Sequence, residues 1–88
     1  MEHLDGNAIA GLMAELFGRE MTLATGVCGT CRAVRRVAEL RVYVRAPGTV
    51  VRCPVCGAVL LRIVQAPGRT WVDMRGLQTL QVDVEGDA

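Results

Sequence analysis

Four cysteines are the residues of this 88-residue chain whose type and spacing most clearly predict chemistry. They form two pairs, each with two residues between its members: Cys28, Cys31, Cys53 and Cys56. The 21 residues between the pairs are one more than the usual length in paired-cysteine zinc sites, and a hairpin absorbs the excess. Because the two-residue spacing lets one tight turn direct both sulfurs at a single ion, the sequence predicts one structural Zn²⁺ with four thiolate ligands in tetrahedral geometry.

The residues around each pair fit a tight turn. Pro54 stiffens the second turn, and Gly57 follows its last cysteine, where a left-handed backbone is commonly needed. Gly29 gives the first turn its freedom, but Arg32 stands at the position equivalent to Gly57. We therefore expect the first turn to depart somewhat from the form of the second.

Other uses of paired cysteines fit this pattern less well. An iron centre of rubredoxin type takes the same four ligands and stays an alternative, although the few aromatic residues and the many nearby arginines favour zinc. Two disulfides suit an exported protein, but pairs of this spacing bridge poorly across a sheet. A thioredoxin-like dithiol needs one pair that opens a helix in a strand–helix–strand unit, whereas both pairs here lie among predicted strands.

An amphipathic helix is predicted ahead of the cysteines, over about residues 7–17. Apolar side chains recur there at helical spacing: Ile9, Leu12, Met13, Leu16 and Phe17. Asp5 or Asn7 can accept a backbone N–H at the start of the helix, and Gly18 fits its end. We expect the apolar stripe to cover one face of a sheet, and a partner-binding helix is the alternative.

The remaining residues, about 21–82, show the pattern of short antiparallel strands. Residues 37–45 alternate, with one face made of Ala38, Leu40, Val42 and Val44 and the other of Glu39, Arg41, Tyr43 and Arg45. Further strands are predicted over 21–25, 49–52, 58–65, 69–74 and 77–84, with Pro–Gly turns over 46–48 and 66–68. The expected fold is small α+β, a zinc-ribbon antiparallel β-sheet with an N-terminal amphipathic helix, in a single domain over 1–88.

The folding of this domain is expected to depend on its metal. Hydrophobic residues make up 51% of the chain but aromatic residues only 3%, so the core has few large side chains. In a chain this short, apolar burial and lost conformational entropy usually come close to cancelling. Structural zinc contributes on the order of 10–16 kcal/mol in zinc-finger peptides, which is far more than such a balance leaves.

The composition argues against an enzyme. The chain contains no serine and no lysine, and its single histidine, His3, lies near the terminus. Four cysteines committed to one ion leave no open coordination position for a reactive water. A general acid–base pair would need acids such as Glu39 and Asp73 to meet, and no pattern predicts that. We therefore expect a non-catalytic protein without a small-molecule substrate.

A cytoplasmic location is expected. The N-terminus begins acidic, and its apolar residues are periodic instead of continuous, unlike a signal peptide. No run approaches the roughly 18 apolar residues of a membrane span. In the cytosol thiols stay reduced, so paired cysteines there more often hold metal than form disulfides.

The charge of the chain is uneven. All ten basic residues are arginine, and residues 28–69 contain eight of them against one acid, Glu39. That segment carries a formal +7, which a zinc tetrathiolate lowers to about +5. Arg41, Tyr43 and Arg45 share a predicted strand face on which a nucleic-acid base could stack. Nucleic-acid binding at these three residues is nevertheless the alternative, because the whole chain has a net charge of only +1.

A protein-interaction or regulatory module, including self-association, is the main expectation. The helix stripe is one surface for a protein partner, and the apolar strand around residues 58–64 is another if it lies at a sheet edge. Trp71 would be a binding hot spot if exposed. A lone tryptophan in an aromatic-poor chain is more often in the core, which is the placement we expect.

The cysteine motifs also carry a family resemblance. "CGTC" and "CPVCG", each after a predicted strand, resemble the knuckles of the zinc-ribbon fold group. From "HLDGNAIAG" through "VRCPVCGAVLLRIVQAPGRTWVDMRGL" the chain is similar to a family of small uncharacterised actinobacterial proteins, a domain of unknown function, over roughly residues 3–80. The resemblance implies a zinc ribbon with an added helix and the four cysteines as ligands, and it implies no activity.

Overall fold

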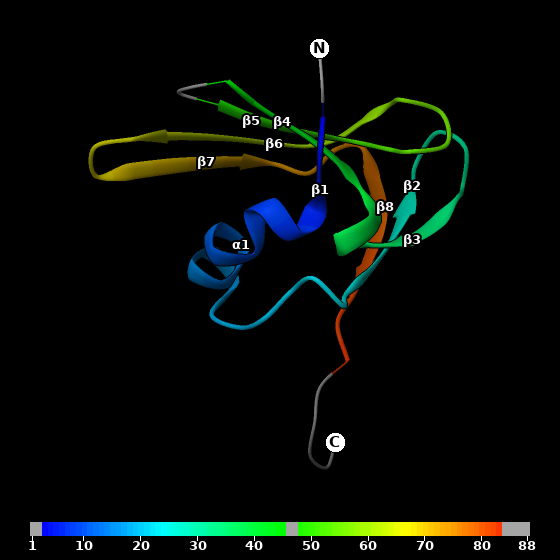
Figure 1. The fold of residues 1–88 in the computed structure, drawn as a ribbon, viewed down its shortest axis with the longest axis horizontal. Coiled ribbons are helices and arrows are strands. Elements are labelled where there is room, and N and C mark those ends of the chain that lie inside the picture. Colours follow the sequence, from blue (N-terminus) through cyan, green and yellow to red (C-terminus); the bar gives the residue numbers. More distant parts are fainter. Residues whose placement is uncertain (1–2, 46–47, 84–88) are drawn as a thin grey trace.

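Two antiparallel sheets and one short α-helix make up the fold (Figure 1). The computed structural model describes residues 3–45 and 48–83. The larger sheet has the strand order β1 (Leu4–Asp5), β4 (Arg41–Arg45), β5 (Gly48–Arg52), β6 (Val59–Ala66), β7 (Arg69–Asp73). The smaller sheet has the order β3 (Val34–Arg36), β2 (Thr25–Cys28), β8 (Leu77–Gln81). The expected small α+β class is confirmed, but the strands form two sheets where the sequence suggested one.

The predicted N-terminal helix is present, and its first turn is a 3₁₀ helix. This turn, η1 (Gly6–Ile9), leads directly into α1 (Ala10–Phe17). The Asp5 carboxylate accepts the Asn7 backbone N–H at 3.0 Å, and Gly18 ends α1 with a left-handed φ of 73°. Within the described ranges, no helix has the length and apolar character needed to cross a membrane.

The core lies between α1 and the inner face of the larger sheet (Figure 1). Met13 of α1 is fully buried, and it belongs to the same apolar cluster as side chains from the three central strands: Val42, Val51, Leu61 and Ile63. Leu12 and Leu16 pack partly against this cluster, whereas Phe17 at the end of the helix is exposed. The stripe of α1 therefore covers a sheet face, as the sequence predicted.

Two predicted strand segments are turns instead, and local carboxylates give the reason. Residues 37–39 form a second 3₁₀ helix, η2 (Val37–Glu39), because the Glu39 carboxylate accepts the Arg36 N–H at 2.8 Å. Residues 21–24 turn because the Glu20 carboxylate accepts the Thr22 N–H at 2.7 Å. Side-chain acceptors of this kind compete with the pairing of strands.

The structure also corrects two expectations about burial. Trp71 has 51% of its surface exposed, where the composition suggested a core position. Val44 is 59% exposed although it shares a face with buried Val42, because it lies near the end of β4. Both side chains lie outside the apolar cluster that α1 covers.

The two sheets meet closely at Gly76, in the connection between β7 and β8. The Gly29 N–H, in the turn after β2, donates to the Gly76 carbonyl at 2.9 Å. On its other side Gly76 lies against β6: a Cβ built on it would lie 1.9 Å from the Val59 carbonyl oxygen. No side chain fits there without a shift of the backbone, so this contact requires glycine.

We predict that Gly76→Ala lowers the free energy of unfolding by at least about 2 kcal/mol, because the methyl group must displace the backbone of β6. The matched control is Gly11→Ala in α1, where a Cβ would meet nothing within 4 Å. That variant should be more stable than the parent by about 0.5–1 kcal/mol. Denaturant titration of both proteins checks this, and a Gly76→Ala variant as stable as the parent would contradict the close packing.

Candidate metal centre

Each cysteine pair lies in the turn of a β-hairpin. The first turn joins β2 to β3 and the second joins β5 to β6, so the pairs come from different sheets. In both turns the N–H of the first cysteine donates to the carbonyl five residues later, and its own carbonyl accepts the N–H four residues later. These distances are both 3.0 Å in the turn that begins at Cys28 and both 2.9 Å in the turn that begins at Cys53.

The same backbone shape requires a left-handed residue after each second cysteine. Gly57 has a φ of 80°, and Arg32 at the equivalent position has a φ of 67°. Arg32 is the one non-glycine residue with positive φ in the described part of the chain, and its guanidinium donates to the Gln78 side chain at 3.0 Å. The expectation that the first turn departs from the second is therefore wrong for the backbone, because Arg32 adopts the conformation that glycine supplies at Gly57.

The four sulfur atoms come together where the two turns face each other. The distance from Cys28 Sγ to Cys56 Sγ is 3.7 Å, and that from Cys31 Sγ to Cys53 Sγ is also 3.7 Å. All four atoms lie within 4.8 Å of one another. A tetrahedral ion with metal–sulfur bonds of about 2.3 Å places its sulfurs about 3.8 Å apart, whereas a disulfide needs about 2.05 Å. The separations fit four ligands around one ion.

Backbone N–H groups are directed at the first sulfur of each pair. The Thr30 and Cys31 N–H groups lie 3.4 and 3.5 Å from Cys28 Sγ. The Val55 N–H lies 3.4 Å from Cys53 Sγ. Donors of this kind stabilise a thiolate against its thiol, so the turns prepare these two sulfurs for binding a cation.

The thiol pKa values show that the turns favour the thiolate of Cys28 but not that of Cys31. Burial raises the pKa of Cys28, but the N–H groups of Cys31 and Thr30 outweigh it and lower that pKa to about 6. The Ala33 N–H lowers the pKa of Cys31, yet burial and the neighbouring thiols raise it to about 11. Because neighbouring thiolates oppose each other's ionisation, a cation among them is what allows all four to ionise together.

The centre is partly embedded in the core. Cys28 and Cys53 are buried within the apolar cluster, Cys31 is half-buried and Cys56 is exposed. Four soft sulfur donors favour zinc, copper(I) or iron over hard cations such as magnesium. The residues present therefore fit one metal ion held by four thiolates, which is the ligand set predicted from the sequence.

The predicted nucleic-acid residues lie on β4, whose residue Arg41 pairs with Arg52, the neighbour of Cys53 in the chain. Arg41 and Arg45 are exposed and Tyr43 is half-buried. A cation from another strand lies over the Tyr43 ring: the Arg52 guanidinium carbon is 5.9 Å from the ring centroid. The sequence analysis missed Arg52 as a neighbour because strand register, which pairs Arg41 with Arg52, is not visible in one strand's alternation.

The fold and the centre define a small α+β protein with a four-cysteine cluster that could hold a metal ion. The sequence model of a family described as "Family of unknown function (DUF6510)" matches residues 1–85, and the chain belongs to this family. The predicted membership of a family of unknown function is confirmed over nearly the whole chain. Comparison with curated proteins and comparison with solved structures gave no match.

We predict that Arg32→Gly raises the free energy of unfolding of the metal-loaded protein by about 0.5–1 kcal/mol. Glycine removes the cost of about 1–2 kcal/mol of a left-handed L-residue, and loss of the exposed hydrogen bond to Gln78 offsets part of the gain. Arg32→Ala keeps the strained backbone and loses that bond, so it should be less stable than the parent. If the glycine and alanine variants prove equally stable, the backbone argument is wrong.

Proposed function

We propose that this chain is a structural zinc-binding domain of zinc-ribbon type that acts as a non-catalytic interaction or regulatory module. The convergence of four sulfurs from two hairpins, with separations that fit a tetrahedral ion, carries this proposal. A cytoplasmic location, where thiols stay reduced, is part of it.

Zinc is the proposed metal, and iron of rubredoxin type is the alternative. Both accept four thiolates at similar distances, so the choice depends on the surroundings of the centre. The buried core of the described chain includes no aromatic side chain, and one ligand, Cys56, is exposed. A redox iron centre gains from a dry aromatic shell, whereas Zn²⁺ has no redox chemistry and needs no such shell.

The proposed role of the ion is to tie two sheets together. Cys28 and Cys31 belong to the hairpin of the smaller sheet, and Cys53 and Cys56 belong to that of the larger sheet. An ion bound to all four would hold the two turns in one rigid junction. Because metal binding and folding are coupled in small domains of this kind, removal of the ion should release the smaller sheet first.

The absence of catalysis is proposed from the ligand set. Four thiolates complete a tetrahedral shell and leave no position for a substrate or a reactive water. His3, the only histidine, is exposed beside the Tyr43 ring, at a centroid distance of 5.9 Å. The interaction surface, and not a reactive group, is then what the fold offers.

Two of the surfaces expected to bind a protein partner are covered by other elements, and a different surface is exposed. The stripe of α1 is used by the core, and β6 lies between β5 and β7, so its apolar face is not an edge. Among the described strands, β7 ends the larger sheet and is exposed along most of its length. Such an edge can pair with a strand of another protein or of a second copy, which is the form of protein binding that we propose.

We predict one Zn²⁺ per chain, measured by elemental analysis of protein expressed with its thiols reduced. Chelation of the metal, or Cys53→Ser, should abolish cooperative thermal unfolding followed by circular dichroism, since the core alone gives little net stability. The matched control is Val55→Ser in the same turn, whose side chain is exposed and whose backbone N–H still reaches Cys53 Sγ. That variant should keep its zinc and its transition.

Two outcomes would contradict the proposal. A coloured protein loaded with iron would make the centre rubredoxin-like. A reduced, metal-free protein that stays folded and melts cooperatively would show that the ion does not hold the fold.

A further inference from the structure

The outer face of the larger sheet, on the side away from α1, combines aromatic rings with arginines. Directly paired residues of neighbouring antiparallel strands project from the same face. Tyr43 pairs with Val50, Val50 with Arg62, and Val64 with Trp71. By this register the outer face carries two aromatic side chains and five arginines: Tyr43, Trp71, Arg41, Arg45, Arg52, Arg62 and Arg69.

The arginines of this face are largely uncommitted. Among residues 3–45 and 48–83, no hydrogen bond or ion pair involves the guanidinium groups of Arg41, Arg45, Arg62 or Arg69. The Arg52 guanidinium donates to the Gly57 carbonyl at 2.8 Å and keeps its charge. Five cations therefore stand on one sheet face, and no carboxylate of the described residues is bound to any of them.

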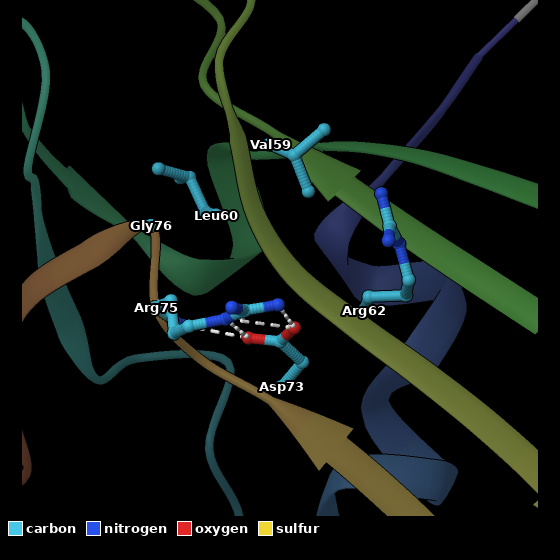
Figure 2. Close-up of a pocket in the computed structure, with 6 residues that line it drawn as sticks. All are labelled: Val59, Leu60, Arg62, Asp73, Arg75 and Gly76. Atoms are coloured by element: carbon cyan, nitrogen blue, oxygen red, sulfur yellow. Dashed lines mark hydrogen bonds and ion pairs between the residues drawn. The ribbon is translucent and has the colours of Figure 1, made fainter.

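The same register places two acids on this face, Asp73 opposite Arg62 and Asp5 opposite Arg41, and they cancel only part of its charge. Asp73 is held by Arg75, with 2.7 Å between the guanidinium Nη2 and the carboxylate Oδ2, and this contact lowers the pKa of Asp73 to about 2. Figure 2 shows Arg75 directed at Asp73, while the Arg62 guanidinium points away from the pair. Asp5, in register with Arg41, accepts the Asn7 N–H. The face keeps a clear excess of positive charge.

Each ring is accompanied by an arginine. The Arg52 guanidinium carbon lies 5.9 Å from the centroid of Tyr43, and that of Arg69 lies 5.8 Å from the centroid of Trp71. An open hollow of about 390 Å³ includes Tyr43 and Arg45 in its lining, and another of about 460 Å³ includes Trp71 and Arg62.

We infer that this outer face binds single-stranded nucleic acid, with bases stacked on Tyr43 and Trp71 and phosphates held by the arginines. Rings flanked by guanidinium groups match the stacking platforms that take bases without regard to sequence. Three inter-strand steps of about 4.8 Å separate β4 from β7. The resulting span of about 14 Å corresponds to roughly four nucleotides at a stacked rise of about 3.4 Å. A duplex keeps its bases stacked inside and offers these rings nothing comparable.

This inference gives the proposed module a second binding surface, separate from the β7 edge, and rests on its metal-held fold. The test therefore uses zinc-loaded protein whose metal content and circular dichroism are measured on the same sample. Fluorescently labelled single strands of about 12 nucleotides, as DNA and as RNA, are titrated between about 50 and 200 mM salt. A duplex of the same sequence and a poly-glutamate peptide are the competing probes. Trp71 is the only tryptophan, so its fluorescence reports stacking directly.

We expect both single strands to bind more tightly than the duplex or the acidic peptide and to quench Trp71. The ratio of the two affinities then shows whether the protein prefers single-stranded DNA or single-stranded RNA. Trp71→Ala should weaken binding at least about fivefold and leave the salt dependence unchanged. Arg45→Ala should reduce the slope of log affinity against log salt by about 0.7, the value for one lost phosphate contact on a single strand.

Matched controls lie close to the tested residues. Val44→Ala changes an exposed apolar residue on the opposite face of β4, and Arg36→Ala removes an exposed arginine from the smaller sheet. Both should bind like the parent. If these controls lose as much affinity as Trp71→Ala and Arg45→Ala, the loss comes from net charge or from damage to the fold. The assignment of binding to the outer face is then wrong.

Three results would overturn the inference while leaving the proposed module intact. One is dissociation constants above about 10⁻⁴ M for every single strand, the weak end of non-specific binding. Another is an affinity for the duplex or the peptide that equals the affinity for the single strands, together with single-strand binding that leaves Trp71 fluorescence unchanged. The third is a folded, zinc-loaded protein that binds no strand and self-associates through β7. Protein that lacks zinc yet folds and binds the strand would instead contradict the proposed function alone.

Discussion

The meeting of two cysteine pairs at one point adds a second junction between the two sheets, beside the close contact at Gly76. The pairs lie in hairpin turns of different sheets, and their sulfurs approach to 3.7 Å across the junction. The backbone hydrogen bonds within each turn, and the N–H groups directed at its first sulfur, are present without an ion. A cation held by the four sulfurs would offset part of the charge of four crowded thiolates and join the two local structures at one point.

The position of this junction explains why the outer face of the larger sheet is not needed for packing. The sulfurs could fasten the sheets through one metal ion, while η1 and α1 cover the inner face through Ile9 and Met13. A sheet that is held from one end and from one side can leave its other face to solvent. Trp71 and the arginines on that face lie outside the buried core, so the face is open to contact with other molecules.

Much of the site and part of the fold could be predicted from the sequence, because the signals are local. The spacing within each cysteine pair fixes a turn, and the stripe that includes Met13 fixes a helix face. The sequence could not show that residues 37–39 and 21–24 turn, since the deciding acceptors are the carboxylates of Glu39 and Glu20. Nor could it show the face shared by Tyr43 and Trp71, which depends on the register of four strands.

The aromatic residues of this chain lie outside its buried core. The buried core of the described residues is made of Met, Leu, Ile, Val, Ala and Cys, side chains that fill the irregular space beside the metal centre without large rings. Tyr43 is half-buried, and Phe17 and Trp71 are exposed. A chain that folded by apolar burial alone would gain most from turning such rings inward, at roughly 150–250 Å² of buried surface each. Since this chain leaves Trp71 exposed beside Arg69, its core gains nothing from the largest side chain in the sequence, and a metal ion held by the four cysteines would be a further source of stability.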